Sequence, residues 1–329
     1  MDAGLGTVAV GVVVGNPVAD EVRRNGGLVR HVCGGTATYA SLALRALGLD
    51  VALVGSTGRD HDDMLRAPLV TAGVDLRYLG MTDRGPSSAY LLDYVGSPPI
   101  RSVRLQHRGP VLQPQDVPRL PFGTAFVHVG EVAGEILPQA IRLLASWARP
   151  MGIDLHALRR FSEDGTVTLG SAAESGIDFG HFDTVKGSVE EIRAFDPAAP
   201  DLEASLRAIT GLGVRHVFAT DGGCGALMMT TEGIVPIPAF PVEEVDATGA
   251  GDVFLAGFLF ASHALGEAPR DAALFGAAMA SFVVEGPGAS VLGDLAGVLQ
   301  RRAVLNGGIH PCIHDPGTIN PGNQEGVNS

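Results

Sequence analysis

The sequence predicts an α/β fold with a mostly parallel sheet that carries helices on both faces. Short apolar stretches typical of buried strands alternate along the chain with Ala- and Leu-rich stretches typical of helices. The chain has 329 residues, of which 46% are hydrophobic, and this is enough to fill one large core. Residues 87–106 instead alternate around a Gly-Ser-Pro-Pro turn, which predicts a small antiparallel appendage.

The expected elements follow in order along the chain. Strands are expected at residues 7–15, 51–54, 125–129, 152–155, 184–186 and 216–219, and helices at residues 36–47, 61–72, 135–148, 202–210 and 253–264. We expect one domain over residues 1–305, with the appendage strands inserted around residues 83–108. Residues 306–329 are rich in Gly, Pro and Asn and lack periodicity, so we expect a poorly ordered tail.

Composition excludes several classes of partner. The formal net charge is −13 and no block of Lys or Arg occurs, which argues against binding to nucleic acid or to an anionic membrane. Cys33, Cys224 and Cys312 are scattered without CxxC spacing, which indicates a reducing compartment. The apolar start lacks a basic residue ahead of it and favours a buried strand over a signal peptide, so we expect a cytoplasmic protein. The ten histidines show no metal-ligand spacing, and we interpret them as surface or incidental residues.

The stretch DATGAGD, residues 246–252, stands directly before the apolar helix expected at residues 253–264. A helix start presents N–H groups and the positive end of the helix dipole, and glycines let an anion approach that backbone. The alternative is that Asp252 only caps the helix. Lys186 is the only lysine, so a GxxxxGK[ST] phosphate loop is absent and backbone amides are the plausible ligands of an anion.

Two separated signatures resemble those of the pfkB-type, ribokinase-like carbohydrate kinases. They are GGTATYASLALRALG at residues 34–48 and DATGAGD at residues 246–252. Two shorter segments agree with the family, at residues 55–74 and 219–227, and the likeness extends from residue 7 to residue 302. Within the family the chain is most similar to myo-inositol kinases, at Tyr39, where ribokinases carry Asn, and at residues 132–138, 154–159 and 186–191.

The resemblance implies a kinase that transfers the γ-phosphoryl group of ATP to a hydroxyl of a small polyol, most closely a cyclitol such as myo-inositol. Asp252 matches the catalytic base of the family, and the amides of Gly249, Ala250 and Gly251 match its anion hole. Phosphoryl transfer requires mainly positioning and charge stabilisation, which agrees with these residue types. The alternatives are a ribose- or fructose-type sugar kinase, a nucleoside kinase of the same family, and a nucleotide-binding regulator without catalysis.

The resemblance also implies a nucleotide site with Mg²⁺, and it allows a monovalent cation such as K⁺. Its expected members are Lys186, Ser188, Glu191, Thr220, Gly222, Gly225 and Thr248. Glu191 matches a family residue that organises Mg²⁺ through water, but the spacing of Ser188 and Glu191 is also that of a capping box, which binds nothing. The alternative for residues 220–225 is an ordinary turn. The alternative for Lys186 is a lysine at a strand end whose ammonium reaches solvent.

The acceptor site is expected to use carboxylates and bare amides, which suit an uncharged polyol. Its candidate members are Asp20, Gly34, Gly35, Tyr39, Glu131 and Glu135. The alternatives are that Asp20 is a solvated loop acid and that Tyr39 is a core aromatic, and only one of the two glutamates is expected to contact the acceptor. We expect the appendage to act as a lid over this site and to pair with its copy in a homodimer.

Overall fold

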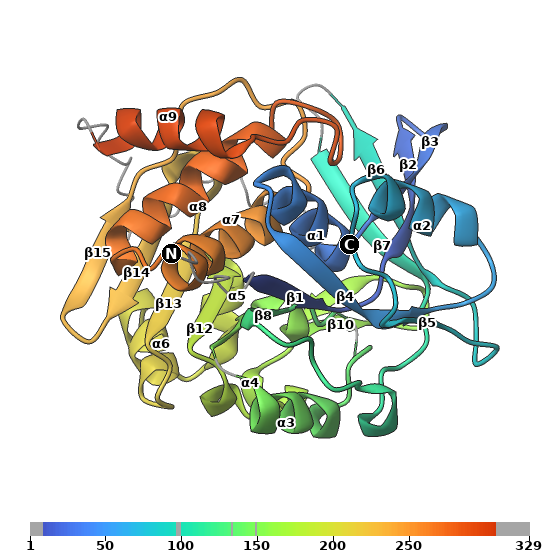
Figure 1. The fold of residues 1–329 in the computed structure, drawn as a ribbon, viewed down its shortest axis with the longest axis horizontal. Coiled ribbons are helices and arrows are strands. Elements are labelled where there is room, and N and C mark those ends of the chain that lie inside the picture. The colour runs from blue at the N-terminus through green and yellow to red at the C-terminus, as the bar shows by residue number, and fades with distance from the viewer. Residues whose placement is uncertain (1–8, 97–99, 133, 149, 307–329) are drawn as a thin grey trace, which may run out of the picture.

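The central sheet confirms the predicted α/β class (Figure 1). The computed structural model describes residues 9–96, 100–132, 134–148 and 150–306. In spatial order the sheet contains β15 (Gly233–Ile237), β14 (Ala226–Thr230), β13 (His216–Thr220), β12 (Thr184–Ser188), β9 (Met151–Asp154), β8 (Thr124–Val129), β1 (Val10–Val14), β4 (Asp50–Thr57) and β5 (Leu79–Met81). The strands from β13 to β5 run parallel, and β14 and β15 form an antiparallel edge.

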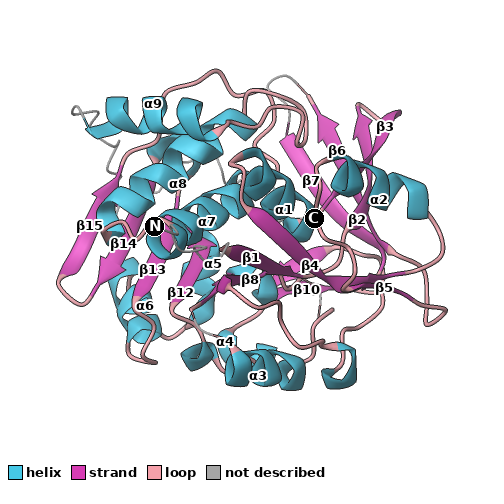
Figure 2. Ribbon diagram, in the orientation of Figure 1, coloured by secondary structure: helices cyan, strands magenta, loops and turns pink. Residues whose placement is uncertain are grey.

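Helices cover both faces of this sheet, as the alternating pattern predicts (Figure 2). One face carries α1 (Thr36–Ala46), α7 (Ala250–Leu259), α8 (Pro269–Val283) and α9 (Leu295–Asn306). The other face carries α3 (Pro138–Trp147), α5 (Val189–Phe195) and α6 (Leu202–Thr210), while α2 (Asp62–Thr71) and α4 (Ala172–Ser175) are peripheral. Each face has its own apolar core, because successive side chains of a strand point to opposite sides.

A second sheet stands beside the central one and is called the appendage sheet here. Its spatial order is β3 (Gly27–Gly34), β2 (Val18–Arg24), β6 (Ser88–Val95) and β7 (Ile100–His107). The hairpins β2/β3 and β6/β7 are antiparallel, and a parallel pair of β2 with β6 joins them. The sequence pattern predicts only β6 and β7. It misses β2 and β3 because charged residues stand next to one another there and obscure the alternation.

Helix α7 begins three residues before the stretch predicted from the sequence. Its N-cap is Gly249, with a φ of +85°, so GAGD lies in the first turn. After Leu259 the chain continues as one π-helical turn, Phe260–Ala264. A short 3₁₀ turn, Leu155–Leu158, follows β9, and β10 (Arg159–Phe161) then pairs with β11 (Val167–Leu169).

Further expectations from the sequence concern the cysteines, the C-terminal tail and membrane crossing. Cys33 and Cys224 are not joined in a disulfide. Cys312 and residues 307–329 of the expected tail lie outside the described residues. Among the helices of the described chain, none combines the length and the apolar character needed to cross a membrane.

Candidate active site

A cavity of about 550 Å³ opens at the carboxyl ends of the parallel strands, where α/β proteins collect their ligands. The appendage sheet forms one wall, through Asp20, Tyr90 and Leu92. The first turn of α7 lies in the middle, and the loop after β13 lines the far end. The cavity therefore brings together the predicted catalytic and nucleotide residues and four of the six predicted acceptor residues, while Gly34 and Glu131 do not line it.

Asp252 lies at the centre of this cavity with only 5% of its surface exposed. The hydroxyl of Thr36, at the start of α1, donates a hydrogen bond of 2.8 Å to Asp252 Oδ1. The pKa of Asp252 is raised by burial, against the opposing charges of His156 and Lys186 and the hydrogen bond from Thr36. A raised pKa strengthens a carboxylate as a proton acceptor, as general-base catalysis requires.

The first turn of α7 has no room for side chains on its glycines. A Cβ on Gly249 would collide with the ring of Tyr39, and a Cβ on Gly251 would collide with the Lys186 ammonium. Both glycines line the cavity beside Ala250. The Ala250 N–H, however, donates to Ala247 O at 3.2 Å, so the predicted anion hole depends mainly on Gly249 and Gly251.

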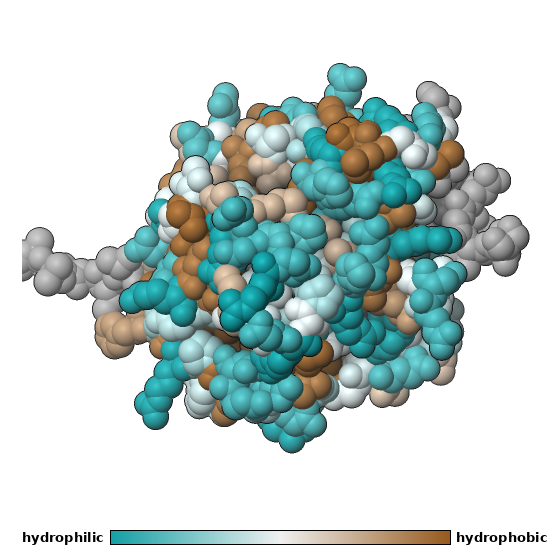
Figure 3. Space-filling view, turned by 90° about the vertical axis from the view of Figure 1, so that its right-hand side faces the viewer, coloured by the Kyte–Doolittle hydropathy of each residue, from teal (hydrophilic) through white to brown (hydrophobic). Residues whose placement is uncertain are grey.

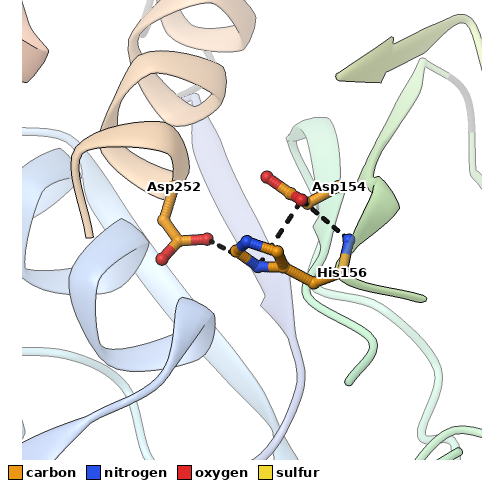
Figure 4. Close-up of side chains that lie close together, drawn as sticks. All are labelled: Asp154, His156 and Asp252. Atoms are coloured by element: carbon orange, nitrogen blue, oxygen red, sulfur yellow. Dashed lines mark hydrogen bonds and ion pairs between the residues drawn. The ribbon is translucent and has the colours of Figure 1, made fainter. Parts of the chain in front are cut away.

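A cluster of charged side chains lies beside Asp252 (Figure 4). Lys186 Nζ donates to Asp154 Oδ2 at 2.5 Å, and both residues are buried. The His156 ring lies between Asp154 and Asp252, with Nδ1 at 3.5 Å from Asp154 Oδ1 and 3.7 Å from Asp252 Oδ1. Burial opposes ionisation of Asp154, but the charges of His156 and Lys186 outweigh it and lower the pKa of Asp154.

This cluster has the spacing of a cation site but not the chemistry of one for Mg²⁺. One ligand atom each from Asp154, His156 and Asp252 lie within 4.8 Å of one another. Mg²⁺ prefers oxygen ligands and is commonly held by substrate phosphates and water, whereas this set includes an imidazole. The Lys186 ammonium already supplies Asp154 with a positive charge. These residues therefore do not fit Mg²⁺.

Ser188 and Glu191 form the capping box that the spacing allowed. Ser188 Oγ accepts from the Glu191 N–H at 3.1 Å, and Glu191 Oε2 accepts from the Ser188 N–H at 2.9 Å. The other oxygen, Glu191 Oε1, accepts from Arg159 Nη2 at 3.1 Å. Both carboxylate oxygens thus already accept hydrogen bonds from the protein, although both residues also line the cavity.

The far end of the cavity contains Thr220, Gly222 and Gly225 of the nucleotide residues predicted from the sequence. The Thr220 hydroxyl donates to Gly187 O at 3.1 Å, which ties the end of β13 to β12. Gly222 and Gly225 have φ values of +50° and +89°, and a Cβ on Gly225 would collide with the backbone of β15. Thr248 lies nearer the appendage sheet, 3.1 Å from the Tyr94 hydroxyl.

Asp20 and its two neighbouring glycines lie at the opposite end. Asp20 belongs to β2 and is buried, so the alternative of a solvated loop acid is wrong. Gly34 lies so close that a Cβ there would collide with the Asp20 carboxylate. Gly35 is the N-cap of α1 with a φ of +83°. Asp20 and Gly35 line the cavity.

The two glutamates occupy different places. Glu135 lines the cavity, and its carboxylate accepts from the Ser88 hydroxyl at 2.6 Å and from Asn16 Nδ2 at 3.3 Å. Glu131 lines a separate pocket and accepts from the backbone N–H groups of Gly134 and Ile136. Burial raises the pKa of Glu131 to about 8 and that of Glu135 to about 7. Glu135 is therefore the better placed of the two for contact with an acceptor.

Tyr39 is a core aromatic that also reaches the cavity wall. Its side chain is buried in the core between α1 and α7, and its ring packs against Gly249. It also lines the cavity, so an acceptor-facing role for Tyr39 stays a prediction.

The interpretation of the histidines as surface or incidental residues is wrong for two of them. His156 lies in the charged cluster, and His128 on β8 is fully buried with no hydrogen-bond partner for either ring nitrogen among the described residues. Burial lowers the pKa of His128 to about 4. Sequence spacing did not reveal His156, because its partners Glu191 and Asp252 come from distant parts of the chain.

Comparison with known proteins decides the family. The model of the pfkB family of carbohydrate kinases matches residues 7–293. The chain belongs to the pfkB family. A pfkB-family chain is a phosphotransferase with a hydroxyl acceptor, and this confirms the resemblance predicted from the two signatures. The chain is also 30% identical over 287 residues to an inositol 3-kinase of Oryza sativa subsp. japonica, across 83% of this chain and 68% of that protein.

Solved structures of similar fold agree with this pfkB assignment. A Vibrio cholerae O395 fructokinase double mutant, bound to fructose, ADP and potassium ion, superposes with a TM-score of 0.74 at 21% identity, across 89% of this chain and 98% of that one. A pyrophosphate-dependent kinase in the ribokinase family, complexed with a pyrophosphate analogue and myo-inositol, has a TM-score of 0.71 at 18% identity, across 84% and 96%. At these identities the likeness establishes the fold alone.

Proposed function

We propose that this pfkB-family protein transfers the γ-phosphoryl group of ATP to a hydroxyl of a cyclitol such as myo-inositol. The carrying observation is that Asp252, buried at the start of α7, lines one cavity together with residues that the sequence predicts for the acceptor and for the nucleotide. The 30% identity to an inositol 3-kinase supports the cyclitol. Mg²⁺ would arrive with the nucleotide phosphates, where water and phosphate oxygens suit it best.

In the proposed reaction Asp252 takes the proton of the attacking hydroxyl. That oxygen forms a bond to the γ-phosphorus while the bond from the γ-phosphorus to the bridging oxygen breaks, so ADP leaves with the bonding electrons. The amides of Gly249 and Gly251 face the charge on the transferring group, and the start of α7 adds the positive end of its dipole. The proton remains on Asp252 until the products leave.

The acceptor end offers polar groups that suit a ring with many hydroxyls. Asp20 provides carboxylate oxygens, and Glu135 is held in place by Ser88 and Asn16. Leu92 and Val103 supply an apolar part of the wall that the appendage sheet forms. We propose that the appendage sheet acts as a lid on this end of the cavity.

The appendage sheet also has the edge that a homodimer would use. β3 is an edge strand, and Leu28 and Val29 on it are each 58% exposed. Figure 3 views the side of the molecule that carries this sheet, where hydrophobic residues form small patches between hydrophilic ones. Exposed strand edges tend to be paired or covered, which supports pairing with a second copy. Light scattering should then give twice the mass of 33.9 kDa.

The test is to compare kcat/KM for myo-inositol, its deoxy analogues, ribose, fructose and adenosine with ATP as donor. A site that bonds each hydroxyl leaves buried polar groups unpaired when one is missing, so a deoxy-inositol should lose up to roughly 10⁴- to 10⁵-fold. A value for ribose, fructose or adenosine well above that for inositol would replace the cyclitol by a sugar or nucleoside. No turnover of any acceptor, with ATP still bound, would indicate a regulator.

A further inference from the structure

The ring of His156 occupies a central place in the charged cluster, although neither ring nitrogen lies within hydrogen-bond distance of the described carboxylates there. Its Nδ1 lies 3.5 Å from Asp154 Oδ1 and 3.7 Å from Asp252 Oδ1, and its Nε2 lies 3.7 Å from Glu191 Oε1. Asp154, Glu191 and Asp252 come from β9, α5 and α7. Figure 4 shows the ring placed between Asp154 and Asp252.

The backbone at His156 is tied to the charged cluster. The His156 N–H donates to Asp154 Oδ1 at 2.9 Å, where the short turn Leu155–Leu158 begins. Asp154 is held in turn by Lys186, so the base of the His156 side chain is anchored beside Asp154. The side chain is 18% exposed and faces the cavity.

Without a charge on His156, the negative groups around its ring outnumber the positive ones. The charged and titratable groups that face it from the packed elements are Asp154, Glu191, Asp252, Lys186, Arg159 and His128. Three of these are carboxylates and two are cations, while His128 is neutral because burial lowers its pKa to about 4. An imidazolium at His156 makes the numbers of positive and negative charges equal. That positive charge would lie within 3.7 Å of a carboxylate oxygen of each of Asp154, Glu191 and Asp252.

We propose that His156 is a positioning residue whose imidazolium keeps the buried carboxylate of Asp252 ionised and ready to accept the proton of the acceptor hydroxyl. This inference rests on the proposed role of Asp252 as base. Burial alone favours protonated Asp252, and a protonated carboxyl cannot accept the hydroxyl proton. The proton passes from the hydroxyl oxygen to Asp252, and His156 keeps its own proton throughout.

The experiment measures Asp252 directly by a pH titration of the ¹³C-labelled Asp carboxyls in the full-length protein. The signal is assigned with Asp252→Asn, and the test variant is His156→Gln. The matched control is His181→Gln, since His181 pairs with Asp178 at 3.6 Å and does not line the cavity. An opposite charge within about 4–6 Å lowers a carboxyl pKa by about 1–3 units, so His156→Gln should raise that of Asp252 by at least about one unit. His181→Gln should leave it unchanged.

A second measurement separates positioning from a merely structural role. The acid limb of the pH profile of kcat/KM should move to higher pH in His156→Gln by the same amount. At pH values below that limb, kcat/KM of His156→Gln should be about tenfold lower than that of the wild type. Above the limb the two values should converge. A structural defect would lower the rate at every pH equally. The proposal would be overturned if the folded His156→Gln variant kept both the acid limb of the wild type and its Asp252 pKa.

Two outcomes keep this proposal distinct from the proposed function. If His156→Gln fails to fold, ¹⁵N-labelled histidine in the wild-type protein still decides, because a neutral His156 ring at pH 7 overturns the proposal and an imidazolium supports it. If the Asp252 signal shifts as expected but the wild type phosphorylates no acceptor, the proposed function fails and the role of His156 is supported.

Discussion

The ring of Tyr39 on α1 packs directly against the α-carbon of Gly249, the N-cap residue of α7. A Cβ at position 249 would collide with that ring, so the two residues fit only because one of them has no side chain. The glycine-rich segment that begins α7 therefore packs against an aromatic ring from the other signature segment. This contact gives Tyr39 a role even if it never touches the acceptor.

Replacing Tyr39 by Leu should lower kcat more than it raises KM for the acceptor. The smaller side chain leaves space beneath Gly249, and a displacement of about 1 Å in reacting groups costs about 10²-fold in rate. Steady-state kinetics with both substrates varied would measure the two effects. Tyr78→Leu, before β5 and away from the cavity, controls for general loss of packing. A raised acceptor KM with kcat unchanged would favour Tyr39 as a wall of the acceptor site.

Asp252→Asn should reduce kcat/KM by about 10²- to 10⁴-fold, because it removes the proton acceptor but keeps the shape. Calorimetry should show that ATP still binds, and the melting temperature should remain close to that of the wild type. The matched control is Asp271→Asn, an acid in the first turn of α8 outside the cavity. Retention of most activity by Asp252→Asn would restore the interpretation of this residue as a helix cap.

Tyr94→Phe should loosen the appendage sheet from the glycine-rich loop. The Tyr94 hydroxyl donates to Asp246 Oδ1 at 3.0 Å and lies 3.1 Å from Thr248 Oγ1. Loss of one such bond costs about 1 kcal/mol net, so kcat/KM should fall about fivefold, with Tyr78→Phe as control. An equal rate in both variants would mean that this link does not couple the sheet to the site.

The free energy of unfolding should fall as the pH rises from 5 to 8.5. Burial raises the pKa of Glu131 in the folded protein to about 8, from its ordinary value of 4.5 in the unfolded chain. Below pH 4.5 Glu131 is protonated in both the folded and the unfolded protein, so no stability is lost. Between these values the unfolded chain releases a proton that the folded chain retains, and the stability lost grows until the folded pKa is passed.

Denaturant unfolding at pH 5, 7 and 8.5 measures this loss, which should be on the order of 2 kcal/mol or more. Glu135 adds to it in the same direction, with a folded pKa of about 7. Glu131→Gln should reduce the difference between pH 5 and pH 8.5, whatever its effect on absolute stability. Glu232→Gln, which replaces an exposed glutamate, should leave the difference between pH 5 and pH 8.5 unchanged. A wild-type protein that is equally stable at both pH values would contradict the burial of Glu131 as an acid.

Local patterns in the sequence predicted much of the fold and the position of α7. Strand composition predicted β8, β9, β12 and β13, and the glycines before residue 253 predicted the helix start. These features depend on neighbours within a few residues. The parallel pairing of β2 with β6 joins segments about 70 residues apart and has no local signature.

The same limit applies to the site. Asp252 and Glu135 were predicted from motifs at strand ends and a helix start, whereas His156 and Thr36 were not. Thr36 bonds to a residue 216 positions away, and His156 lies between side chains from three elements. Only the folded arrangement makes the charge of His156 relevant to Asp252. Spacing rules for histidine ligands therefore gave no indication of it.

The pairing of β2 with β6 also has a consequence for the order of folding. The first hairpin of the appendage sheet leaves the ribosome well before its partner strand, and α1, β4 and α2 are made between them. Until residue 95 emerges, the β2 edge of the β2/β3 hairpin lacks its partner strand, and an isolated two-stranded hairpin is marginal in water. Contacts between distant segments form slowly, so the two halves of this sheet should join late in biosynthesis. A nascent chain that stalls before that point would expose Val18–Arg24 as a free edge, which is the kind of surface that chaperones protect and that aggregates when they do not.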